Sequence, residues 1–240
     1  MPLPKISTPT YELELPSNKK KIKYRPFLVR EEKILIMALE SENTKRISDA
    51  IVQVLKDCIL TRGIKINELA TFDIEYLFLN IRAKSVGETV EVNVTCPDDG
   101  ETMVPMEIAI DDIKVQKEKE HTNIIKLDDK LSMKLKYPSM NQFIESNFEV
   151  SDSDMGVDQS LKMITTCVDI IYDSEESWSA SDCTKKELTD FIEQLNTKQF
   201  KEIENFFTTM PKLSHKVNVK NPNTGVESEV VLEGLASFFS

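Results

Sequence analysis

The chain has 240 residues, of which 40% are hydrophobic and 30% are charged, a composition typical of a folded globular protein rather than a disordered one. Its formal net charge of −11 disfavours general nucleic-acid binding, since such binding depends on Lys and Arg side chains that neutralise phosphates. No apolar run is long enough to span a membrane, the N-terminus lacks the apolar region of a signal peptide, and four scattered cysteines fit a reducing compartment.

Residues 11–24, near the N-terminus, are predicted to form a β-hairpin. Residues 11–15 and 21–24 alternate polar and apolar side chains, which is the period of a half-buried strand. In such a hairpin Glu12 and Glu14 face lysines of the second strand. We therefore interpret the lysines of residues 19–23 as cross-strand partners rather than as a phosphate-binding patch.

Three helices are predicted next, over residues 30–41, 44–61 and 72–84, from apolar side chains at helical spacing. The first begins with Glu31 and Glu32 at the positive end of its dipole, and its apolar stripe consists of Leu35, Ile36 and Leu39. Asn43 or Thr44 is expected to cap the second helix, and Cys58 falls on its apolar stripe as a small buried hydrophobe.

A second hairpin is predicted over residues 90–106. Val90, Val92 and Val94 alternate with polar residues, and the turn residues 97–100 end in Asp-Gly. Residues 217–225 match residues 92–100 at both valines, Asn, Pro and Gly, and each copy follows an aromatic-rich helical segment. The sequence therefore suggests two helix-plus-hairpin units.

The middle of the chain is predicted to continue with a charged loop, a third hairpin and a helix. Residues 111–120 have loop composition, residues 124–127 and 131–135 form the hairpin, and a capping box at Ser139 opens a helix over residues 139–148. The acidic stretch 149–158 resembles a linker. It divides the chain into an N-terminal α+β domain with hairpins, residues 1–150, and a C-terminal helical segment that ends in the repeat hairpin, residues 151–240.

The C-terminal segment is predicted to hold three helices, over residues 160–172, 184–195 and 198–208. A capping box at Thr184 and Glu187 opens the second, and Trp178 is expected in a polar loop between the first two. Together these patterns predict an α+β fold of helices and antiparallel hairpins.

The repeated hairpins raise the question of a metal site, because their turns resemble the knuckles of a zinc ribbon. The four knuckle positions are Cys96, Asp99, Asn221 and Thr224, and only one of them carries a thiol. Asn and Thr are poor zinc ligands, so we expect a ribbon-like shape without a bound metal or other cofactor.

Catalytic motifs are also missing from the sequence, which has no phosphate loop, no nucleophile elbow and no His-Glu-x-x-His. Only two histidines are present, and the paired aspartates fall at expected turns. A non-enzymatic protein is therefore predicted. One alternative is a nucleic-acid-binding module derived from a zinc ribbon, which the net negative charge and the missing zinc ligands disfavour. Another is a cell-wall hydrolase that uses carboxylates, which is disfavoured because the paired acids fall at expected turns.

Three blocks of the chain resemble the baseplate hub proteins of T-even-type tailed bacteriophages: residues 23–33, residues 72–79 leading into 82–88, and the ending 232–235 with Phe238 and Phe239. The resemblance implies a role in building the central hub of the tail baseplate, as a hub subunit or as an assembly factor that acts as a chaperone. It further implies the host cytoplasm as the place of assembly, the virion as a second location for a subunit, and hub and tape-measure proteins as partners. Self-association is a further option that we consider beside these partners. The resemblance brings no active-site residues.

The expected partner-binding residues are Trp178, Leu235, Phe238 and Phe239. An exposed aromatic among polar residues is a common interface anchor, and acidic surroundings attract a basic partner. The alternative is that Trp178 and the terminal phenylalanines pack onto the protein's own core.

Overall fold

The computed structural model describes residues 6–139, 142 and 157–238, and the chain forms two compact units. Unit 1 consists of Met1–Gln116 together with Lys212–Ser240, and unit 2 is the intervening segment Lys117–Pro211. The boundary predicted at residues 150–151 lies outside the described residues and stays a prediction. In the structure the C-terminal segment Lys212–Ser240 belongs to the same unit as the N-terminal residues, whereas the predicted division places it in the second domain.

Unit 1 begins with a hairpin and three helices, as predicted. Their bounds are β1 Tyr11–Glu14, β2 Lys21–Tyr24, α1 Val29–Leu39, α2 Thr44–Cys58, the short 3-10 helix η1 Ile66–Glu68, and α3 Thr71–Ala83. Glu12 pairs with Lys23 and Glu14 with Lys21 across the hairpin, which confirms the cross-strand partnership. The side chain of Asn43 caps α2 by accepting a hydrogen bond from the Arg46 amide at 3.0 Å.

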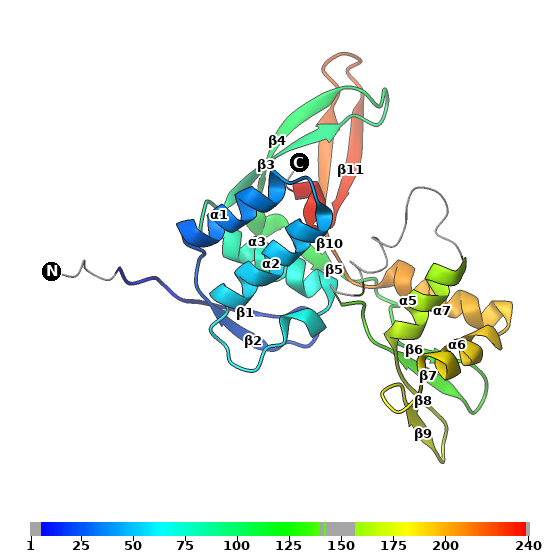
Figure 1. Cartoon of the computed structure of the whole chain (residues 1–240). Coiled ribbons are helices and arrows are strands. Elements are labelled where there is room, and N and C mark those ends of the chain that lie inside the picture. The colour runs from blue at the N-terminus through cyan, green and yellow to red at the C-terminus, as the bar shows by residue number, and fades with distance from the viewer. Residues whose placement is uncertain (1–5, 140–141, 143–156, 239–240) are drawn as a thin grey trace. The chain divides into compact units, whose positions relative to one another are not determined.

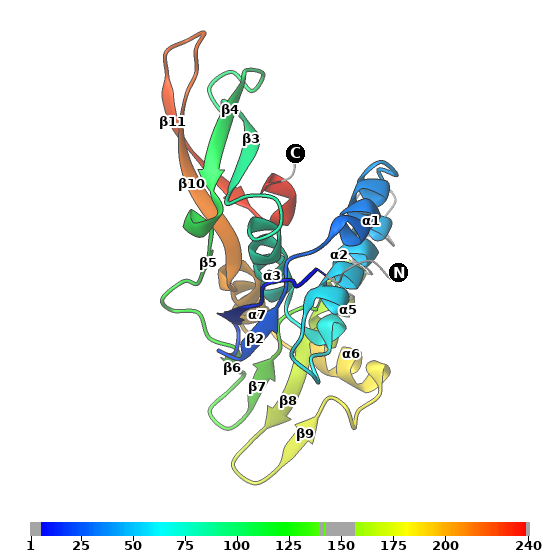
Figure 2. The same ribbon diagram turned by 90° about the vertical axis from the view of Figure 1, so that its left-hand side faces the viewer.

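The remainder of unit 1 is built mainly from two long hairpins, which lie side by side in both views of the chain (Figures 1 and 2). The elements are β3 Thr89–Thr95, β4 Met103–Ala109, the 3-10 helix η2 Ile110–Asp112, β5 Lys114–Gln116, β10 Lys212–Lys220, β11 Glu227–Glu233, and the C-terminal 3-10 helix η3 Leu235–Phe238. Strands β3 and β4 form one sheet, and β11, β10 and β5 form another in that order. The region predicted as a loop, residues 111–120, thus contains η2 and β5, because residues 114–116 pair with the start of β10.

The valines that alternate along β3 are buried together with those of β10. Val90, Val92 and Val94 share one core cluster with Val217 and Val219, which also includes Leu79 of α3 and Phe238 of η3. The period-two pattern therefore has the packing role that the sequence predicts.

Within the described residues, unit 2 consists of a four-stranded antiparallel sheet and three helices. The strands are β6 Ile124–Lys126, β7 Ser132–Leu135, β8 Val168–Tyr172 and β9 Ser177–Ser179, in the order β6-β7-β8-β9, and the helices are α5 Val157–Cys167, α6 Lys185–Glu193 and α7 Thr197–Thr209. The capping box of α6 forms as predicted, with the Glu187 amide donating to Thr184 Oγ1 at 3.2 Å and the Thr184 amide to Glu187 Oε2 at 2.7 Å.

Two predictions for unit 2 were wrong and one lies outside the described residues. Residues 168–172 form a strand rather than the end of a helix, because a β-branched run can pair with β7. Trp178 lies in strand β9, paired with Ile171 of β8, rather than in a loop. Residues 140–141 and 143–148 of the helix predicted over 139–148 lie outside the described residues. Ser139 and Gln142 do make the hydrogen bonds of its capping box.

The α+β class is confirmed, but the second helix-plus-hairpin unit is not. Helix α3 and the hairpin β3–β4 both lie in unit 1. Helix α7 belongs to unit 2, whereas the hairpin that follows it, β10–β11, belongs to unit 1. The two hairpins therefore repeat as hairpins only.

Candidate functional site

The turns of the two repeated hairpins meet through side-chain hydrogen bonds. Asn221 Nδ2 donates to Asp99 Oδ2 at 2.8 Å and to the carboxylate of Asp98 at 3.1 Å. Thr224 Oγ1 donates to Asp98 Oδ2 at 2.5 Å, and Asn223 donates to Thr102 at 3.0 Å. The hairpins are thus joined at their tips as well as along their valine faces.

The two turns also have the same backbone design. The amide of Gly100 donates to the carbonyl of Cys96 at 2.9 Å, and the amide of Gly225 donates to that of Asn221 at 2.8 Å. Both glycines have positive φ, +70° and +78°, which explains why the repeat keeps glycine there. The sequence repeat therefore reflects one turn geometry used twice.

The four positions considered as zinc knuckles lie at this junction of the two turns, where Asp99, Asn221 and Thr224 take part in the hydrogen bonds. Cys96 is completely buried, and Asn221 is 1% exposed. Hydrogen bonds from Thr102 lower the pKa of Asp99, and one from Thr224 lowers that of Asp98. Over the described ranges no three or more His, Cys, Asp and Glu side chains are grouped as metal ligands, so the zinc-ribbon interpretation gains no support.

The predicted partner-binding residues fall in different units of the chain. Trp178 belongs to unit 2, whereas Leu235 and Phe238 belong to unit 1, and Phe239 lies outside the described residues. Phe238 is completely buried and Leu235 is 8% exposed. Leu235 and Phe238 are therefore buried within unit 1, and Phe238 packs in its hydrophobic core.

The C-terminal segment is also held by the partly buried carboxyl group of Glu75. The amide of Leu235 donates to Glu75 Oε1 at 3.0 Å. Burial raises the pKa of Glu75 to about 7, and the hydrogen bond from Leu235 opposes that rise only partly. Folding therefore favours the protonated carboxyl, so this group's contribution to stability falls as the pH rises from its unfolded value near 4.5 through about 7.

Trp178 lines an apolar pocket of unit 2. The pocket has a volume of about 280 Å³, and Trp178 itself is 40% exposed. Its other walls come from β8, from the start and middle of α6, and from the segments beside them: Leu131, Ile171, Cys183, Glu187, Leu188 and Phe191. A half-exposed tryptophan beside an apolar hollow is the arrangement of an interface anchor.

Sequence reasoning missed a second exposed apolar surface, on helix α1. Its predicted stripe is not the buried side, since Ile36 and Leu39 are each 49% exposed. The buried residues of α1 are Glu31 and Ala38. The signal was present in the sequence, because apolar side chains from 34 to 39 surround the helix instead of keeping to one face.

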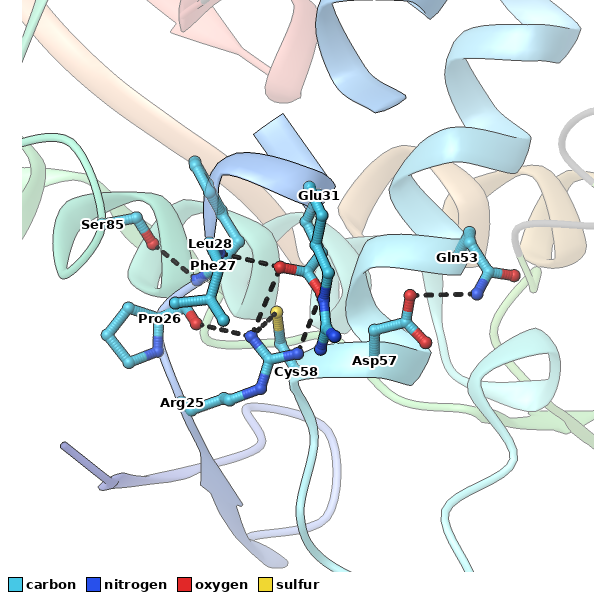
Figure 3. Close-up of polar contacts among 10 residues, drawn as sticks. Arg25, Pro26, Phe27, Leu28, Glu31, Gln53, Asp57, Cys58 and Ser85 are labelled. Atoms are coloured by element: carbon cyan, nitrogen blue, oxygen red, sulfur yellow. Dashed lines mark hydrogen bonds and ion pairs between the residues drawn. The ribbon is translucent and has the colours of Figure 1, made fainter. Parts of the chain in front are cut away.

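The N-terminus of α1 is fixed by a buried ion pair (Figure 3). Arg25 Nη2 donates to Glu31 Oε1 at 2.9 Å, and the Leu28 amide donates to Glu31 Oε2 at 2.8 Å. Arg25 also contacts the sulfur of the buried Cys58 at 3.7 Å, which ties the start of α1 to the end of α2. The helix is therefore anchored firmly by polar contacts while much of its apolar surface stays exposed.

No helix within the described ranges is long and apolar enough to cross a membrane. A family model described as T4 bacteriophage base plate protein matches residues 8–240. Searches of curated proteins and of solved structures found no matching chain.

Proposed function

Because the chain belongs to the family of T4 bacteriophage base plate proteins, we propose that it is a non-enzymatic protein that helps to build the central hub of the tail baseplate. It acts in the host cytoplasm during assembly, by binding other hub proteins or tape-measure proteins, as a hub component or as an assembly factor. Membership of this family supports a role in the phage tail baseplate. The hub, the partners and the absence of catalysis are our proposal.

The observation that carries the proposal is the apolar pocket beside Trp178. A pocket of about 280 Å³ accommodates a single large apolar side chain, and nearly all of its walls are apolar. Trp178 lies on β9, which is the last strand of its sheet, so its side chain is held by a strand rather than by a mobile loop (Figure 1). Rigid aromatic anchors of this kind contribute much of the free energy of protein–protein binding.

The charges around this pocket indicate the chemistry of the partner. Glu187 is the charged residue among those that line the pocket. Asp173, Glu175 and Glu176 form the turn between β8 and β9. Asp182 lies in the turn before α6, whose first two residues are Lys185 and Lys186. We infer a partner segment that presents an apolar side chain flanked by Lys or Arg. Glu187 attracts such a partner, whereas it repels an acidic segment.

The test is co-purification from phage-infected cells with tagged wild-type protein and with Trp178→Ala. We expect the wild type to capture hub or tape-measure proteins, and Trp178→Ala to reduce that capture by about tenfold or more, as for an interface hot spot. The matched control is Ile124→Ala, which removes another exposed apolar side chain of unit 2, 43% exposed and outside the pocket. Circular dichroism establishes that both variants fold.

The outcomes separate the parts of the proposal. If the wild type captures neither hub nor tape-measure proteins, the proposed function is wrong. If a folded Trp178→Ala captures them as well as the wild type does, the pocket is not the binding surface. Detection of the protein in purified tails indicates a hub component, and its absence there indicates an assembly factor that leaves the particle.

A further inference from the structure

Helix α1 presents an apolar outer face that its own unit does not cover. Its inner side, with Glu31 and Ala38, is buried. On the outer face Val29 is 80% exposed, Met37 60% and Ile36 49%. Large exposed apolar side chains gathered on one helix face mark a packing surface, so this face indicates a further packing partner.

Two opposite charges lie on the same face. Lys33 and Glu40 are seven residues apart, which is about two helical turns, so they lie on nearly the same line along the helix. Both side chains are exposed, and Glu40 keeps helical backbone angles as the C-cap residue. Neither takes part in an ion pair within the part of the chain that the structure describes. Ile36 and Met37 lie between them.

This pattern is complementary to itself after a two-fold rotation. When two copies of α1 lie antiparallel, Lys33 of each copy comes opposite Glu40 of the other, and Ile36 comes opposite Met37 at the centre. An interface of this kind is isologous, because the same patch serves both subunits. The net charge of −11 opposes association of two copies, so the apolar centre must supply most of the binding free energy.

We propose that the outer face of α1 is a homodimer interface, in which two helices pack antiparallel and exchange Lys33–Glu40 ion pairs. The occupant of the face is thus a second copy of this chain. The proposal is independent of the Trp178 pocket, which lies in unit 2. It therefore stands or falls separately from the proposed function.

The first test is the mass of the full-length protein in solution, measured by sedimentation velocity over a wide range of concentrations. We expect the wild type to pass from monomer to dimer as concentration rises, and Met37→Glu to remain monomeric. The matched control is Met103→Glu, which places the same charge at a methionine of β4 that is 66% exposed, and it should dimerise like the wild type. Melting temperatures close to that of the wild type show that the variants fold.

The second test reverses the charges. Lys33→Glu creates two Glu–Glu pairs in the dimer and Glu40→Lys creates two Lys–Lys pairs, so each variant alone should self-associate about tenfold more weakly. An equimolar mixture of the two variants restores both opposite-charge pairs, and it should form a mixed dimer with close to wild-type affinity.

Three results would overturn the proposal. A wild type that stays monomeric at every concentration shows that a second copy of the chain does not cover α1. A dimer that survives Met37→Glu uses a different surface. A mixture of the two charge variants that associates no better than either alone excludes the antiparallel arrangement.

Discussion

Glu31 shows how a charged side chain is retained in the interior of unit 1. Its side chain is 1% exposed, and that of its partner Arg25 is 12% exposed. Burial alone would raise the pKa of this carboxyl group, but hydrogen bonds from Arg25, Arg30 and the Leu28 amide outweigh burial and lower the pKa to about 2. The ionised form is therefore the one that folding favours.

We expect Glu31→Gln to destabilise the protein by about 3 kcal/mol at pH 7, because Arg25 then stays buried without a counter-charge. The pKa of Glu31 is lower in the folded state than in the unfolded state. Its stabilisation is therefore complete above the unfolded value near 4.5 and is lost as the pH falls toward about 2. Urea denaturation at a series of pH values measures the difference between variant and wild type.

The control for this prediction is Glu32→Gln, which removes a neighbouring charge that is only partly buried. It should change stability by less than about 0.5 kcal/mol. A difference between Glu31→Gln and the wild type that stays constant from pH 7 to pH 3 would show that the ion pair is not its cause.

Single residues were predictable from the sequence where their partners are close along the chain. The cap by Asn43 and the capping box of Thr184 and Glu187 are local patterns, and the structure confirms both. The sequence also placed Glu31 at the positive end of a helix. It did not reveal the partners Arg25 and Cys58 as one cluster, because residue 58 reaches the start of α1 only after α2 has folded back.

At the scale of elements, η3 anchors the C-terminal segment of the chain. Phe238 is completely buried in the cluster that joins α3 and the two hairpins. We expect Phe238→Ala to destabilise the protein by about 3–5 kcal/mol, since the truncation loses buried apolar surface and leaves a cavity. Urea denaturation followed by circular dichroism gives the change in the free energy of unfolding.

Val231→Ala is the control for Phe238→Ala, because Val231 belongs to the neighbouring β11 and is 46% exposed. It should cost less than about 1 kcal/mol. If Phe238→Ala is equally mild but abolishes capture of a partner protein, then Phe238 is an interface residue, as the sequence first suggested.

Elements with a clear period were predicted well, and those that depend on distant pairing were not. The alternating valines of β3 predict only a strand, and the apolar spacing of α2 predicts only a helix. Residues 160–172 are apolar at helical spacing, but their second half, Val168–Tyr172, becomes a strand because β7 is available as a neighbour. Trp178 becomes part of a strand for the same reason, and neither outcome can be deduced from local sequence.

At the scale of the whole molecule, unit 2 is inserted between two strands that pair with each other. Gln116 at the end of β5 is paired with Lys212 at the start of β10. The sequence predicts a single boundary in an acidic stretch, because composition can reveal a linker. It cannot reveal that the segments on either side of an insertion belong together.

We predict that unit 1 folds without unit 2. Replacing Lys117–Pro211 by Asn-Gly converts the pair Gln116 and Lys212 into the end of a two-residue β-hairpin, a turn that matches the twist of antiparallel strands. The shortened protein should unfold cooperatively in urea and keep the near-ultraviolet circular dichroism of packed aromatic side chains.

A matched excision that also removes Gln116 shifts β5 by one residue and turns its side chains to the opposite face. This second protein should be clearly less stable than the first. If both are equally stable, the pairing of β5 with β10 does not hold unit 1 together. If both are unfolded, unit 1 depends on unit 2.

The discontinuity of unit 1 has a consequence for the order in which the chain matures on the ribosome. Strands β10 and β11 and the helix η3 are translated last, so the valine face of β3 remains uncovered while unit 2 is being synthesised. Unit 2 is continuous in sequence and has all its strands and helices by Pro211, before β10 emerges. A nascent chain that stalls before β10 would therefore expose the apolar side of the first long hairpin, making it a substrate for chaperones of the host cell.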